Sequence, residues 1–114
     1  MLKIYHNNRC SKSREALAIL QTKGVPFQVV NYLENPPTPV ELQALLEKLG
    51  YQARQLLRSK EAEYLQFGLD NTALTDAQII AAMCQAPKLI ERPIVESESV
   101  AIVARPASLL QDFC

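Results

Sequence analysis

Cys10 is the residue whose type and position most directly suggest chemistry. It lies between an apolar segment, residues 2–5, and an amphipathic segment that begins at Ser11. The amino end of a helix favours the thiolate over the thiol, and nearby cations act in the same direction. We therefore predict a thiolate nucleophile that attracts anionic substrates. Three cations flank it in the sequence: Arg9, Lys12 and Arg14.

The spacing around Cys10 narrows the chemistry. A phosphatase loop would need an arginine where the chain has Ala16, and a dithiol oxidoreductase would need a second cysteine where it has Ser13. Cys10 must therefore pass its intermediate to an external thiol. Ser13 could hydrogen-bond the thiolate or solvate the helix start. His6 could tune the thiol pKa, or be structural, as a single histidine more often is.

Three further arginines adjoin apolar segments. Arg58 follows Leu-Leu, whereas Arg92 and Arg105 each precede a proline. A single arginine at such a place is usually a solvated edge residue. Planar guanidinium groups brought to one point would bind a tetrahedral oxyanion by paired hydrogen bonds. We keep both interpretations here.

The composition excludes several other functions. The 114 residues contain 12 Lys and Arg against 12 Asp and Glu, which gives nucleic-acid binding no support. One histidine and no C-x-x-C pair make a metal site improbable. Cys84 is expected in the core, and Cys114 at a frayed end. With no signal segment, no membrane-spanning apolar run and sparse cysteines, a cytoplasmic protein is expected.

The order of the predicted elements indicates the fold class. A strand, a helix and a strand lie within the first 32 residues, so the two strands should be parallel. A hairpin and a last helix close the chain, with Leu109, Leu110 and Phe113 expected inward. This order is that of a thioredoxin-like α/β fold with a four-stranded mixed sheet. The predicted segments are a strand over 2–5, a helix over 11–23, a strand over 27–32, a hairpin over 93–96 and 100–104, and a helix from 106.

A helical insertion separates the two halves, over residues 38–86 or thereabouts. Capping boxes begin two of its helices, at Thr38 and Thr75, and one or two short helices are expected over 54–67. No linker or repeat interrupts the chain. We therefore predict a single domain over residues 1–114.

Five segments in order across nearly the whole chain resemble the glutaredoxin-coupled arsenate reductase (ArsC) family. The resemblance implies Cys10 as nucleophile, tuned by His6, Ser13 and Arg14, in a monomer without a tightly bound cofactor. It also implies that arsenate condenses with Cys10, and that glutathione and glutaredoxin then complete the reduction. Arg58, Arg92 and Arg105 match the family's oxyanion-binding arginines, whereas Asn8 stands where the family usually has proline. The segments are residues 5–14, 32–38, 56–58, 90–95 and 104–106.

Two other functions remain open at this stage. Regulators of the Spx type share the fold and contact RNA polymerase, although they typically carry a C-x-x-C switch where this chain has Ser13. A monothiol transferase that acts on another small anionic electrophile would use the same cysteine. In that case the arginines could hold a carboxylate of glutathione.

Overall fold

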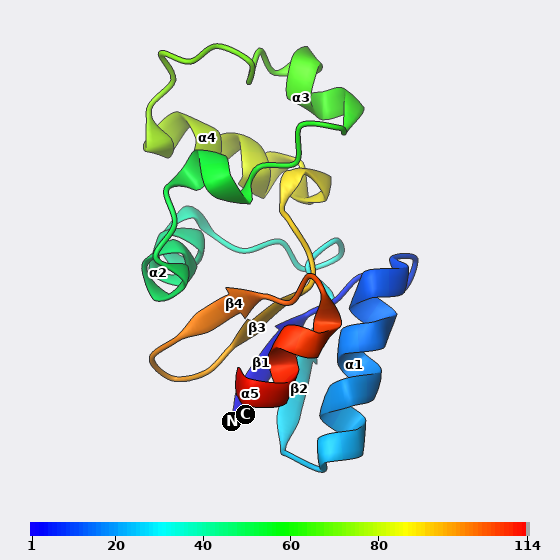
Figure 1. Ribbon diagram of the computed structural model, residues 1–114. Coiled ribbons are helices and arrows are strands. Elements are labelled where there is room, and N and C mark those ends of the chain that lie inside the picture. Colours follow the sequence, from blue (N-terminus) through cyan, green and yellow to red (C-terminus); the bar gives the residue numbers. More distant parts are fainter. Residues whose placement is uncertain (114) are drawn as a thin grey trace. The chain divides into compact units, whose positions relative to one another are not determined.

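The computed structural model describes residues 1–113, without the side chain of Asp112 (Figure 1). Two compact units divide the chain. The first joins Met1–Asn35 to the segment from Arg92 onward, and the second is Pro36–Glu91. The predicted insertion lies within the range of the second unit. That the whole chain forms a single domain stays a prediction, so each unit is described by itself.

The first unit contains a four-stranded mixed sheet in the order β2-β1-β3-β4. Its strands are β1 (Leu2–Tyr5), β2 (Phe27–Val30), β3 (Ile94–Glu96) and β4 (Ala101–Val103). β1 and β2 are parallel, as the helix between them requires, whereas β1–β3 and β3–β4 are antiparallel. This arrangement confirms the predicted thioredoxin-like fold.

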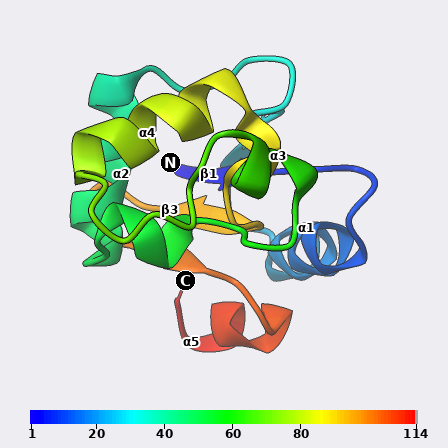
Figure 2. The same cartoon turned by 90° about the horizontal axis from the view of Figure 1, so that it is seen from above.

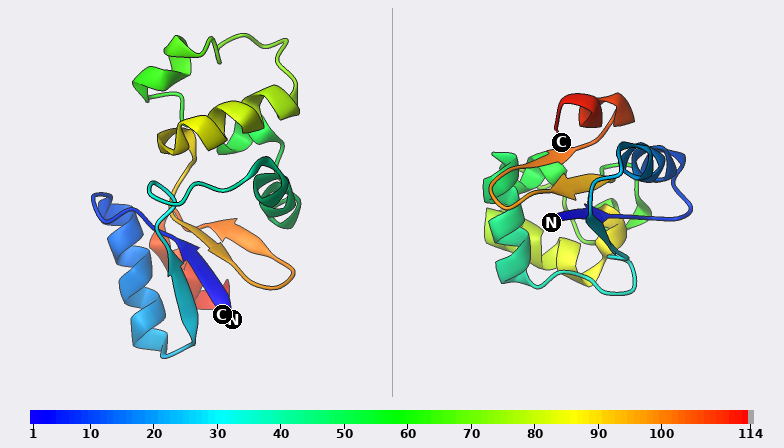
Figure 3. Two further views of the ribbon diagram at one scale, coloured as in Figure 1. Left: turned by 180° about the vertical axis from the view of Figure 1, so that it is seen from behind. Right: turned by 90° about the horizontal axis from the view of Figure 1, so that it is seen from below.

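Helices cover one face of this sheet, as the views from above and behind show (Figures 2 and 3). They are α1 (Ser11–Lys23), a 3₁₀ turn at Ala107–Leu109 and α5 (Leu110–Phe113). α1 ends at Gly24, whose φ of 70° is a left-handed conformation that glycine adopts readily. The apolar face of α1 packs on the sheet. The shared core is formed by Ile4, Ala16, Leu20, Val95, Ala104, Ala107 and Leu110.

The second unit is helical. Its elements are α2 (Pro39–Leu49), a 3₁₀ turn at Ala53–Leu56, α3 (Ala62–Gln66), α4 (Asp76–Gln85) and a 3₁₀ turn at Pro87–Leu89. The capping boxes predicted at Thr38 and Thr75 are both present, with reciprocal bonds to Glu41 and Gln78. Leucines of α2 and Ile79, Ile80 and Met83 of α4 are buried.

Several element boundaries differ from the prediction, and two of the differences have a clear physical reason. β2 ends at Val30, because the carbonyl of Asn31 accepts the amides of Glu34 and Asn35 in a turn. The last helix begins with a 3₁₀ turn after Pro106, and the tighter winding leaves Leu109 49% exposed. The expectation that Leu109 packs inward was therefore wrong. The expectation for Cys114 lies outside the described residues.

Candidate active site

The loop between β1 and α1 positions Cys10 at the amino end of a helix. Cys10 is the N-cap of α1, with extended backbone angles (φ −95°, ψ 120°). Its amide donates to the carbonyl of Asn7 at 3.0 Å, and its carbonyl accepts the amide of Arg14 at 3.1 Å. The amides of the first helical turn lack carbonyl partners inside the helix, so they are available to the thiol.

The surroundings of Cys10 lower the pKa of its thiol. Partial burial alone raises this pKa, but hydrogen bonds from the Ser13 amide, the Arg92 side chain and the Lys12 amide outweigh burial, and the positive charge of Arg92 adds to them. The thiolate that the sequence predicted is therefore favoured. Arg92 is the cation that acts on it.

Two of the three cations nearest to Cys10 in sequence, Lys12 and Arg14, have other partners. Arg14 donates through Nη1 to the carbonyl of Asn8 at 2.7 Å, and Lys12 lies 4.0 Å from Glu15. Arg9 and Arg14 are exposed. This differs from the expectation that these three charges hold the thiolate, because two of them have partners in the loop and the helix.

His6 and Ser13 contact the loop through their side chains. The Oγ atom of Ser13 accepts the amide of Asn7 at 3.1 Å. His6 is 4% exposed, and its Nε2 lies 2.6 Å from Oδ1 of Asn8. The Nδ1 atom of His6 is buried without a hydrogen-bond partner among residues 1–113. That the side chains of His6, Ser13 and Arg14 tune the thiolate stays a prediction. The contacts of these side chains would act on Cys10 through the shape of this loop, whereas the Ser13 amide acts on the thiol directly.

The sheet brings two of the predicted arginines together beside this loop. Tyr5 pairs with Ile94 in the antiparallel register of β1 and β3, so Arg92 lies next to the segment that follows β1. The pairing of β3 with β4 continues as far as Ala104, whose amide donates to the carbonyl of Pro93. Arg105 then donates through Nη1 to the carbonyl of Arg92 at 3.1 Å. Both Arg–Pro peptide bonds are cis.

Arg58 lies in the second unit. Its Nη1 lies 3.1 Å from Oε1 of Glu91, and its Nε lies 3.7 Å from Oε2 of Glu61. The side chain is 16% exposed, so two carboxylates hold a partly buried guanidinium. That Arg58 joins Arg92 and Arg105 around an oxyanion stays a prediction.

Cys84 lies near the end of α4 and is partly buried, whereas Met83 beside it is fully buried. Burial raises the pKa of the Cys84 thiol, and the negative charge of Glu41 raises it further. Cys10 and Cys84 are both free thiols. These surroundings favour the protonated thiol of Cys84.

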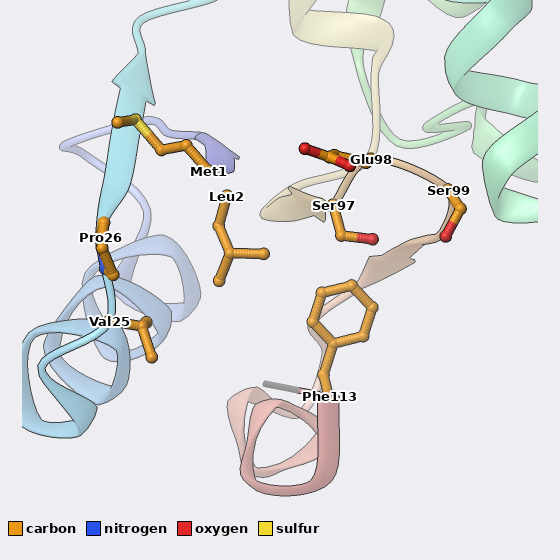
Figure 4. Close-up of a pocket in the computed structure, with 8 residues that line it drawn as sticks. All are labelled: Met1, Leu2, Val25, Pro26, Ser97, Glu98, Ser99 and Phe113. Carbon is orange, nitrogen blue, oxygen red and sulfur yellow. The ribbon is translucent and has the colours of Figure 1, made fainter.

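An apolar groove of about 460 Å³ lies at the other end of the sheet from Cys10 (Figure 4). Met1, Leu2, Val25 and Phe113 contribute side chains to it. Among the described residues, no lysine, arginine, histidine or cysteine side chain lines this groove. Over residues 1–113, no cluster of three or more His, Cys, Asp or Glu is arranged to hold a metal ion.

One feature of this site was not predicted from the sequence. Oδ1 of Asn8 lies 2.6 Å from Nε2 of His6, and the Asn-Asn pair before Cys10 could have signalled a loop held by side-chain amides. The amides of Ser13 and Lys12 act on the thiol as the helix amino end was expected to act, although the sequence did not single out these two amides.

The chain belongs to the ArsC family, whose profile matches residues 5–113. An arsenate reductase of Neisseria meningitidis is 44% identical over 106 residues, which cover 92% of this chain and 91% of that protein. YfgD of Escherichia coli K12, an uncharacterized protein, is 47% identical, with 92% of this chain and 89% of YfgD covered. The solved structure of an arsenate reductase from Vibrio cholerae is 42% identical, with a TM-score of 0.95 over 99% of this chain and 97% of that one.

Across the described part of the chain, no helix combines the length and the apolar character needed to cross a membrane.

Proposed function

We propose that this protein is an oxidoreductase that reduces arsenate to arsenite, with Cys10 as the nucleophile. The observation that carries the proposal is the lowered pKa of Cys10, caused by amides and a guanidinium that converge on its sulfur. Such donors also suit an oxyanion bound beside the thiolate. Membership of the ArsC family and the close relatives named as arsenate reductases support the same substrate.

The proposed reaction begins with attack of the Cys10 thiolate on arsenic(V). A hydroxyl group of arsenate takes a proton from solvent and leaves as water, and a sulfur–arsenic bond forms. The thiol of glutathione condenses at the same arsenic with loss of a second water. A glutaredoxin thiolate then attacks the glutathione sulfur, and the electron pair of the sulfur–arsenic bond reduces arsenic(V) to arsenic(III). Water cleaves the Cys10–arsenic bond and releases arsenite, while the mixed disulfide leaves with glutaredoxin.

Arg92 and Arg105 are the proposed oxyanion ligands of the first unit. Their neighbouring positions, with Arg105 bonded to the Arg92 carbonyl, would set two guanidinium groups beside Cys10. Arg58 is proposed as a third ligand on the basis of the family resemblance. Guanidinium groups stay charged at all relevant pH values, so they neutralise the anion throughout the reaction.

The reaction needs external thiols because the chain lacks the second cysteine of a C-x-x-C motif. Ser13 occupies the place of a local resolving cysteine, so Cys10 has no partner for a disulfide within its own loop. Glutathione as co-substrate, glutaredoxin as partner, a monomeric state and a cytoplasmic location are parts of this proposal. No tightly bound cofactor is required by these steps.

The test is arsenite production by the purified protein with arsenate, saturating glutathione and glutaredoxin. The parent protein should form arsenite, and Cys10→Ser should form none above background. Cys84→Ser is the matched control, because it removes a thiol whose pKa is raised, and it should retain the parent rate. Absence of arsenite from the folded parent protein would overturn the proposal, and a thiol transfer to glutathionylated substrates would then favour the monothiol transferase.

A further inference from the structure

A polar hollow of about 280 Å³ lies in the first unit, and the three residues that precede Cys10 in the sequence contribute to its lining. Two loops form it, one after β1 and one after β2. Because β1 and β2 are parallel, both loops follow the carboxyl ends of strands at one edge of the sheet. Its lining residues are Asn7, Asn8, Arg9, Asn31, Leu33 and Glu34.

Hydrogen bonds inside the loop determine which side-chain groups of Asn7 and Asn8 remain available to a ligand in this hollow. Oδ1 of Asn7 accepts the amide of Arg9 at 3.0 Å, and Oδ1 of Asn8 lies 2.6 Å from Nε2 of His6. The side-chain oxygens are therefore occupied within the loop. The remaining polar groups of both side chains are amino groups, which only donate hydrogen bonds.

Two opposite charges complete the lining. Arg9 and Glu34 are both exposed. Neither side chain makes a hydrogen bond or an ion pair within residues 1–113. The hollow thus combines one guanidinium and several amide donors with one carboxylate. This set matches a small ligand that carries both a carboxylate and an ammonium group.

We propose that this hollow is the subsite for the peptide thiol that reduces the Cys10 intermediate. The zwitterionic amino-acid end of a glutathione-like peptide would place its carboxylate on Arg9 and the asparagine amides, and its ammonium on Glu34. Since Arg9 directly precedes Cys10, the thiol of such a peptide would lie within reach of the sulfur. This inference rests on the proposed function, because it assumes an external thiol.

The direct test is binding of S-methylglutathione, which has the charges of glutathione but no free thiol. Titration followed by amide NMR should shift the signals of the six lining residues. Arg9→Gln and Glu34→Gln should each weaken binding at least about fivefold. Lys3→Gln and Glu98→Gln are the matched controls, since both remove an exposed charge away from the hollow, and they should bind as the parent does.

A kinetic measurement separates a binding role from a structural one. Arg9→Gln should raise the KM for glutathione at least about fivefold and leave the KM for arsenate unchanged. The rate with 2-mercaptoethanol, which has neither charge, should not change. Parent-like affinity of both variants for S-methylglutathione, or shifts confined to other residues, would overturn the subsite. The titration contains no arsenate, so a lack of S-methylglutathione binding would contradict the subsite and not the proposed reduction. Binding of S-methylglutathione by a protein that forms no arsenite would contradict the reduction and not the subsite.

Discussion

Cys10 and Cys84 are both partly buried free thiols, yet their surroundings shift the pKa in opposite directions. Burial is the largest influence on each, and for each it raises the pKa. At Cys10 the amides of Ser13 and Lys12 and the side chain of Arg92 reverse that effect. At Cys84 the nearby Glu41 adds to it.

The difference follows from where each thiol lies on its helix. Cys10 precedes the first turn of α1, where main-chain amides have no carbonyl partners inside the helix. Cys84 lies in the last turn of α4, where the amides are already bonded and the carbonyl end of the helix disfavours a negative charge. The same side chain therefore has a lowered pKa at one helix end and a raised pKa at the other.

The largest expected effect is the difference in alkylation rate between the two thiols. At pH 7, iodoacetamide should modify Cys10 severalfold faster than Cys84, because the two pKa values shift in opposite directions and the thiolate is the reactive form. Peptide-resolved mass spectrometry measures both rates, and distinguishes them from that of Cys114. The Cys10 rate should fall as the pH drops through its lowered pKa, and equal rates at pH 7 would contradict the comparison.

The lowered pKa of Cys10 also predicts a pH dependence of stability. A thiol with a lower pKa in the folded state than in the unfolded state stabilises the fold fully above the unfolded value. That contribution should be lost as the pH falls through the folded value. Cys10→Ser, compared with Cys84→Ser in urea titrations at several pH values, should remove this dependence.

Arg92→Ala should reduce the difference in alkylation rate between Cys10 and Cys84. Loss of its hydrogen bond and charge should raise the pKa of Cys10 and slow its alkylation at pH 7 by about threefold to tenfold, since charge-assisted bonds are the stronger ones. The rate at Cys84 should not change. Arg14→Ala is the control, because that guanidinium bonds the Asn8 carbonyl, and it should have a smaller effect. A larger effect of Arg14→Ala would contradict the role given to Arg92.

Asn8→Ala tests whether the loop around Cys10 depends on its side-chain bond. The variant leaves Nε2 of the buried His6 without its partner, which should cost about 1 kcal/mol of unfolding free energy. Denaturant unfolding measures this cost. Asn8→Asp keeps an acceptor oxygen and should lose less. If both variants are as stable as the parent, the bond does not hold the loop.

Glu41→Gln should give the smallest change, because burial is the larger influence on Cys84. Removal of the charge should lower the pKa of Cys84 and speed its alkylation about twofold, without change at Cys10. Glutamine retains the acceptor that receives the Thr38 amide at 3.0 Å in the capping box. The unfolding free energy should therefore stay within about 0.5 kcal/mol of the parent value. A slower reaction of Cys84 would show that Glu41 does not act through its charge.

Local signals in the sequence predicted most of the fold. The capping boxes at Thr38 and Thr75 predicted helix starts that the structure has at the same residues. The helix predicted over 11–23 also ends at the same residue in the structure, directly before Gly24. These signals act within a few residues, so they can be recognised without knowledge of the tertiary structure. The 3₁₀ start of the last helix was missed, because its tighter winding has no comparably distinct sequence signal.

The sequence by itself determined that Cys10 precedes a helix and has no second cysteine within that turn. These facts depend only on residue order and on helix geometry. Only the tertiary structure decided which cation acts on the thiol. The antiparallel pairing of Tyr5 with Ile94 brings Arg92 beside the loop of Cys10 from far along the chain, whereas Lys12 and Arg14 find partners of their own. Proximity in sequence does not set the direction of a side chain, and sheet register does set which distant residues meet.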